Sequence, residues 1–211
     1  MKKLIATLII AISVVVLVSC NNKTWPTALG NASFVTDRTW TISGNGITQI
    51  WSDAVQTDYC SHKTSFYGGN FGTSIFNIDC RSNPEFPGDL FSWQAVYELR
   101  DELCPYPWRV PTMQDFIDLD IALGGTGNWR YATDENAQFV IDNYINRWGG
   151  AFGGICGASG TLHNQGLWGH YWSQSDENID FGFRLRFTMQ GLISPEDVDG
   201  KNSGVSLRCI R

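Results

Sequence analysis

The strongest constraint on the fold is the order in which the spacing of apolar residues changes along the chain. Short alternating stretches separated by glycines fill residues 38–80, which is typical of short strands. Helical spacing follows in the middle, and residues 149–169 are glycine-rich and irregular. Alternation returns at 181–189 and at 205–210. The order of strands, helices and strands predicts an α+β domain with an antiparallel sheet.

Three helices are predicted in the middle of the chain. The first includes residues 91–100 and is ended by Cys104-Pro105, since a proline disfavours helical geometry in the residue that precedes it. The second begins after Thr112, a good N-cap, with Asp115 at its third position, where a carboxylate favours the helix dipole. It ends at Gly124. The third runs over residues 134–148.

The N-terminal residues have the three parts of an export signal. Lys2 and Lys3 precede an apolar run of about 15 residues, which suits a signal peptide but is shorter than the roughly 20 that a membrane span needs. Leu17-Val18-Ser19-Cys20 follows and resembles the lipobox of bacterial lipoproteins. We therefore expect residues 1–19 to be a signal peptide, Cys20 to be lipid-modified and 20–38 to be a tether. The alternative is a plain cleaved signal followed by a chance cysteine.

The remainder has the size and composition of one globular domain. Removing 19 of the 211 residues leaves 192, and we expect residues 39–211 to form a single domain. The full chain is 43% hydrophobic and has 9 tryptophans, which favours a packed core over a disordered chain. Loss of Lys2 and Lys3 takes the formal net charge from −6 to −8, so we expect no nucleic-acid partner.

Export would place the cysteines in an oxidising compartment, where disulfides persist. Besides Cys20 there are five: Cys60, Cys80, Cys104, Cys156 and Cys209. An odd number leaves at least one thiol unpaired or bonded to another chain. No two cysteines have C-x-x-C spacing, and the three histidines do not stand at zinc-ligand spacing with them. We expect neither a metal nor a cofactor.

Four ordered motifs resemble one bacterial family. Residues 104–112, Cys-Pro-Tyr-Pro-Trp-Arg-Val-Pro-Thr, are similar to the CPxGWRVPT signature of the Fibrobacter succinogenes major paralogous domain, with Pro107 in place of the usual glycine. This family is abundant in exported proteins of the Bacteroidetes and Fibrobacteres. The other three motifs are residues 90–96, 169–173 and 202–211. The likeness covers about residues 85–211.

The resemblance implies a C-type-lectin-like fold, with a small twisted antiparallel sheet, two to three helices and long loops that carry any ligand site. It also implies disulfide pairing. Cys104 and Cys209 belong to two of the family motifs and are expected to be bonded. Cys60 and Cys80 are then expected to form the second bond, which leaves Cys156 as the free thiol.

The function that the resemblance implies is that of a non-enzymatic lipoprotein of the cell envelope. We expect a lipid-anchored protein of the outer membrane that binds a glycan or a cell-surface protein, as an adhesin, a fimbria-associated subunit or a glycan-binding accessory. One alternative is a variable receptor diversified by a retroelement. A second is an enzyme similar to formylglycine-generating proteins, which need a cysteine pair near the C-terminal end. Only Cys209 is near that end here, and it is assigned to a disulfide.

Four residues are candidates for ligand binding. Trp168 lies between two glycines in a loop and can stack on a sugar, and His170 is its near neighbour. Asp176 and Asn178 belong to an acidic stretch that follows. Residues 196–202 resemble a fragment of a calcium loop but lack its distal glutamate, so a solvated acidic turn is favoured there.

Three further residues suggest chemistry that we assign to structure. Cys156 has a histidine seven residues later, but the residues around it do not form a nucleophile elbow, so a catalytic role is disfavoured. Arg109 and Arg208 are expected to be structural partners of buried acids or carbonyls.

Overall fold

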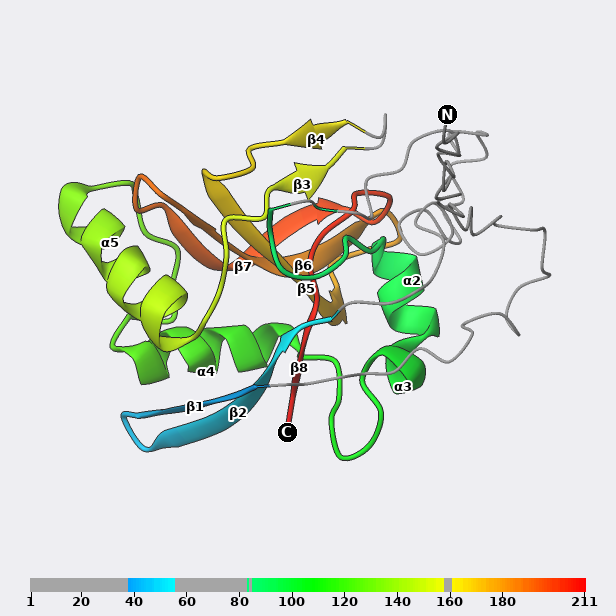
Figure 1. Ribbon diagram of the computed structural model, residues 1–211, viewed down its shortest axis with the longest axis horizontal. Coiled ribbons are helices and arrows are strands. Elements are labelled where there is room, and N and C mark those ends of the chain that lie inside the picture. Colours follow the sequence, from blue (N-terminus) through cyan, green and yellow to red (C-terminus); the bar gives the residue numbers. More distant parts are fainter. Residues whose placement is uncertain (1–37, 56–82, 84, 158–160) are drawn as a thin grey trace, which may run out of the picture.

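The computed structural model describes residues 38–55, 83, 85–157 and 161–211 (Figure 1). The predicted signal peptide, Cys20, the tether before Arg38 and the predicted Cys60–Cys80 bond lie outside these residues.

The described chain is an α+β protein with small antiparallel sheets and few helices, as the order of periodicities predicted. One sheet has the order β1-β2-β8, built from Thr39–Gly44, Ile47–Ala54 and Arg208–Ile210. The second has the order β5-β6-β7, built from Trp168–Asp176, Phe181–Thr188 and Ile193–Gly200. A two-stranded pair joins β3 (Ile155–Cys156) to β4 (Leu162–His163). The helices are α2 (Trp93–Glu98), α3 (Arg100–Leu103), α4 (Met113–Leu123) and α5 (Asp134–Phe139).

Two predicted elements differ in detail from the structure. The third helix continues beyond α5 as a π-helix, η1 (Val140–Arg147), so its second half has wider turns than predicted. In the predicted strand at 205–210 only β8 is regular. Val205 and Ser206 instead form isolated bridges with Phe91 and Tyr171, because the segment changes neighbours there.

The hairpin between β1 and β2 is closed by a two-residue turn. Asn45 and Gly46 have φ angles of 51° and 79°, both in the left-handed region. Such a turn has the twist that two antiparallel strands require, and Asn-Gly is its preferred sequence. The turn pairs Gly44 with Ile47 and sets the register of the hairpin.

Helix α4 packs against both three-stranded sheets, and its ends were predicted correctly (Figure 1). The Thr112 hydroxyl accepts a hydrogen bond from the amide of Asp115, whose carboxylate accepts one from the amide of Thr112 at 2.7 Å. Arg109 donates two more bonds to the same carboxylate, at 2.6 and 2.7 Å. Burial alone would raise the pKa of Asp115, but these bonds lower it. Gly124, with φ at 102°, ends the helix.

Two buried clusters form the core. The first lies around α4 and contains a group of contacting aromatic rings: Trp51, Phe116, Tyr144, Trp148, Tyr171 and Phe187. The second lies around α2 and α3 and includes Phe91, Trp172 and Leu207. Aromatic side chains of this size supply much of the apolar surface that such a domain can bury.

Residues 205–211 pass between these clusters. Backbone hydrogen bonds join this segment to five residues that are distant in sequence: Ile50, Val55, Phe91, Arg109 and Trp172. Val205, Leu207 and Cys209 belong to the second cluster, whereas Ile210 belongs to the first. The segment therefore contributes to both cores at once.

Arg208 is fully buried in this segment. Its Nε donates to the carbonyl of Ser52 and its Nη1 to the carbonyl of Trp148, both at 2.6 Å. The guanidinium carbon lies 4.3 Å from the centre of the Trp148 ring. Burial lowers the pKa of Arg208 to about 10. The prediction that Arg208 pairs with buried carbonyls is confirmed.

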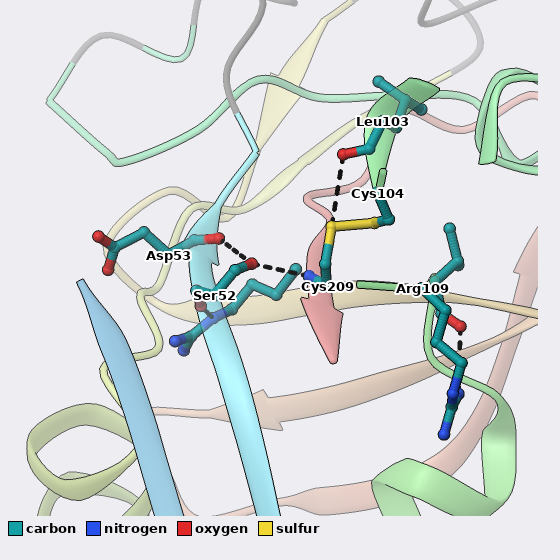
Figure 2. The surroundings of a disulfide bond; sticks show 8 residues. Ser52, Asp53, Leu103, Cys104, Arg109 and Cys209 are labelled. Atoms are coloured by element: carbon teal, nitrogen blue, oxygen red, sulfur yellow. Dashed lines mark hydrogen bonds between the residues drawn. A yellow bond between two sulfur atoms is a disulfide. The ribbon is translucent and has the colours of Figure 1, made fainter. Parts of the chain in front are cut away.

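The disulfide between Cys104 and Cys209 is also confirmed (Figure 2). It joins the end of α3 to β8, with the two Cα atoms 5.6 Å apart. The amide of Cys209 donates to the Ser52 hydroxyl at 2.8 Å, which fixes the same residue against β2.

The prediction that Cys156 is a free thiol is wrong. Cys156 is fully buried and disulfide-bonded, and no described cysteine is free. Since Cys104 and Cys209 are bonded to each other, the partner of Cys156 lies outside the described residues. Pairing depends on which cysteines the tertiary fold brings together, and the number of cysteines alone does not contain that information.

We predict a large loss of stability when the Cys104–Cys209 bond is removed. The bond closes a loop with a sequence separation of 105 residues, and in the chain-entropy account a loop of this size is worth about 4–5 kcal/mol. Urea denaturation of the Cys104→Ala/Cys209→Ala double variant should show that decrease in the free energy of unfolding. A decrease below about 1 kcal/mol would contradict this account of the bond.

Candidate functional site

The two faces of the β5-β6-β7 sheet differ in chemistry. Leu185 and Phe187 of β6 point into the first core cluster. Arg184 and Arg186 alternate with these two residues, so their side chains point to the opposite face of the sheet. There they meet polar side chains of β5 and β7. We call this set the polar face; it consists of Trp168, His170, Arg184, Arg186, Asp197 and Asp199.

Arg184 is the most fully partnered residue of the polar face. It is 6% exposed, and its Nε donates to a carboxylate oxygen of Asp197 at 2.8 Å. Its Nη1 donates to Asp199. The prediction that residues 196–202 form a solvated acidic turn is therefore wrong for residues 196–200: these lie in β7, where Asp197 and Asp199 form ion pairs with an arginine of the neighbouring strand.

Arg186 has fewer partners. Its nearest carboxylate oxygen, on Asp197, is 3.9 Å from Nη1, too far for a hydrogen bond. Its Nε is buried and has no hydrogen-bond partner in the described part of the chain. The guanidinium carbon lies 4.2 Å from the centre of the Trp168 ring, and the side chain is 22% exposed. Arg186 is thus a cation placed over an aromatic ring, with its Nε donor left unused among the described residues.

His170 lies directly across from Arg186 in the strand register. It is 1% exposed, and neither ring nitrogen has a hydrogen-bond partner among the described residues. Its ring centre is 5.8 Å from that of Trp168. Burial, followed by the charges of Arg184 and Arg186, holds the pKa of His170 well below its ordinary value of 6.5. A buried polar group without a partner is destabilising, and it indicates a bound water, a ligand or another functional role.

The other two predicted site residues lie at the opposite end of β5. Asp176 forms an ion pair with Lys201 at 2.9 Å, and the Lys201 ammonium lies 4.0 Å from the centre of the Trp93 ring. Asn178 accepts hydrogen bonds from the amides of Asp180 and Phe181, which closes the turn between β5 and β6. The structure therefore brings Trp168 and His170 together and gives Asp176 and Asn178 local structural partners.

Sequence reasoning missed Arg184 and Arg186 as site residues. The sequence does contain a pattern that points to them: charged residues recur every second position in two separate stretches. The arginines are two residues apart in a strand, and so are Asp197 and Asp199. Charges that alternate in this way on two stretches are suited to cross-strand ion pairs.

Among the described residues, no group of three or more His, Cys, Asp or Glu side chains could hold a metal ion. No described helix is long and apolar enough to cross a membrane.

Comparisons of the chain with protein-family models, with curated proteins and with solved structures find no match. The class that the structure defines is an α+β protein with small antiparallel sheets, few helices and a polar sheet face.

We predict that His170 makes the protein sensitive to mild acid. Because its folded pKa is lowered, the unfolded chain takes up a proton below about pH 6.5 while the folded chain does not. Stability should fall as the pH falls through that value, with a slope of up to about 1.4 kcal/mol per pH unit. The side chains of Arg184, Arg186, Asp197 and Asp199 face the same region.

Urea denaturation between pH 5 and pH 7.5 measures this slope. The His170→Phe variant, which cannot take up the proton, should show a shallower slope than the unsubstituted protein. His163→Gln is the matched control because His163 is exposed. Equal slopes for His170→Phe and the unsubstituted protein would rule out His170 as the source of acid sensitivity.

Proposed function

We propose that this chain is a non-enzymatic lipoprotein of the cell envelope that binds a glycan or a cell-surface protein through the polar face. In this proposal the lipid on Cys20 anchors it in the outer membrane, and residues 20–38 connect the anchor to a single domain. Its biological role would be that of an adhesin, a fimbria-associated subunit or a glycan-binding accessory.

The arrangement of the sheets supports assignment to the C-type-lectin-like fold. One sheet brings an early hairpin and a late strand together, as β1-β2-β8. The Cys104–Cys209 disulfide fastens that late strand to a helix. The second sheet is left to carry a ligand site, together with the loops at its ends. This assignment agrees with the resemblance of residues 85–211 to the Fibrobacter family.

The main support for the proposed function comes from Arg186, whose guanidinium lies over the Trp168 ring and has a hydrogen-bond donor without a partner among the described residues. Most buried donors in a folded protein have partners, yet the Nε of Arg186 has none among the described residues. The guanidinium already packs against the Trp168 ring, which reduces the side-chain freedom that remains to be lost on binding. A cation fixed in this way is suited to bind oxygen acceptors, such as a carboxylate or the hydroxyls of a sugar.

One observation speaks against the enzymatic alternative. An enzyme similar to formylglycine-generating proteins needs a pair of reactive cysteines. Cys209 is bonded to Cys104 and lies in the core, so it does not offer a reactive thiol.

We predict that binding to arrays of glycans and of cell-surface proteins depends on the polar face. The purified full chain should bind at least one arrayed probe, and Arg186→Gln should weaken that binding by about tenfold or more, since hydrogen bonds to charged groups are worth about 1.5–3 kcal/mol. Trp168→Ala should also weaken it, because the ring positions the guanidinium.

Arg100→Gln is the matched control for this experiment. Arg100 also lies over an aromatic ring, that of Tyr97 at 5.0 Å, but on a different part of the surface. Thermal unfolding should first establish that all variants are folded. Binding that survives both Arg186→Gln and Trp168→Ala would show that the polar face is not the binding site, and failure to bind any probe would count against the binding function itself.

A further inference from the structure

The loop between α4 and α5, residues 124–133, exposes two aromatic side chains that the sequence patterns did not single out. Trp129 is 43% exposed and Tyr131 is 73% exposed. Their ring centres are 4.1 Å apart, and the ring planes meet at 72°. We call these two residues the aromatic pair. Two large rings that contact each other in an exposed loop form an apolar surface of the kind that binds partners.

Arg130 lies between Trp129 and Tyr131 in the sequence, and its side chain points into the protein. Both Nη atoms of Arg130 donate to the carboxylate of Asp120, at 2.7 and 2.6 Å, and the Arg130 side chain is only 14% exposed. The backbone of Arg130 pairs with that of Ile193 in both directions. Because side chains alternate along an extended segment, fixing Arg130 inward directs its two neighbours outward.

Further bonds hold this arrangement in place. Asp120 is fully buried and also accepts hydrogen bonds from the Tyr144 hydroxyl at 2.7 Å and the Gly127 amide at 2.8 Å. The side-chain amide of Asn136 donates to the carbonyl of Tyr131 at 2.8 Å. The backbone that carries the aromatic pair is therefore fixed by the protein interior before any ligand arrives, which reduces the entropy lost on binding.

The chemistry of the loop selects the ligand class. Arg130 is the only charged residue from Gly124 to Thr133, and its charge is neutralised by Asp120. The other polar groups within the loop are uncharged, including the amide of Asn128 and the hydroxyl of Thr126. The exposed acids Asp134 and Glu135 follow the loop in the first turn of α5, so the surroundings offer no free cation to an acidic ligand. Aromatic faces bordered by neutral hydrogen-bonding groups match a pyranose ring, which has a C–H face and a rim of hydroxyls.

We propose that Trp129 and Tyr131 form a second binding site, which takes the neutral pyranose rings of a glycan. This site lies outside the polar face and does not depend on the function proposed for it. It gives the domain a place to bind uncharged saccharides that carry no carboxylate for Arg186.

The test follows the indole N–H signals of the ¹⁵N-labelled full chain during titration with four neutral oligosaccharides: cellohexaose, mannohexaose, xylohexaose and chitohexaose. The chain has 9 tryptophans, and the signal of Trp129 is the one lost in Trp129→Phe. At least one sugar should shift that signal. Isothermal titration calorimetry then compares affinities, since replacing Trp129 removes its NMR signal. Trp129→Ala/Tyr131→Ala should weaken binding of that sugar by about tenfold, because two stacking contacts are removed. Trp129→Phe should retain most of the affinity.

Tyr106→Ala is the control, because Tyr106 is an aromatic residue of another loop and is 97% exposed. It should leave the affinity unchanged. If none of the four sugars shifts the Trp129 signal, or if the double alanine variant binds as tightly as the unsubstituted chain, the proposal is overturned. A partner that binds the aromatic pair but is a protein rather than a sugar would also overturn it. These readouts do not involve Arg186, so the two sites can fail independently.

Discussion

The rest of the structure depends on the passage of residues 205–211 through the middle of the molecule. Successive side chains of this segment point alternately to the two clusters of the core, with Leu207 and Cys209 on one side and Ile210 on the other. Its backbone bonds to parts of the chain that are far apart in sequence, and the disulfide adds a covalent link to α3. Both clusters of the core include side chains of residues 205–211, so this short segment connects the two three-stranded sheets.

Arg208 is the least expected residue of this segment. A buried charge is expensive to remove from water, and the carbonyls of Ser52 and Trp148 together with the Trp148 ring offset only part of that penalty. The lowered pKa of about 10 reflects the remainder. These bonds form only when β8 lies in one register against β2, so Arg208 favours that pairing over a shifted one. An apolar side chain at this position would make no such bonds and would impose no such requirement.

Local features were predictable from the sequence, and features that depend on contacts across the fold were not. Thr112 and Gly124 could be assigned to the ends of α4 because a cap involves only its immediate neighbours. Trp129 gave no signal, since an aromatic residue in a glycine-rich loop has no period and its exposure depends on where Arg130 points. Asp197 was misread because its partner, Arg184, is on another strand. The Cys104–Cys209 bond came from the family resemblance, and the same reasoning failed for Cys156 because the tertiary fold chooses the pairs.

The central position of residues 205–211 also determines when the domain can fold. Ribosomes make a chain from its first residue onward, so the hairpin of β1 and β2 exists long before β8 does. Until residue 210 has been made, β2 lacks its second neighbour and Cys104 lacks its partner. The growing chain therefore has no native state to enter early, and it remains loosely structured and in need of protection from aggregation.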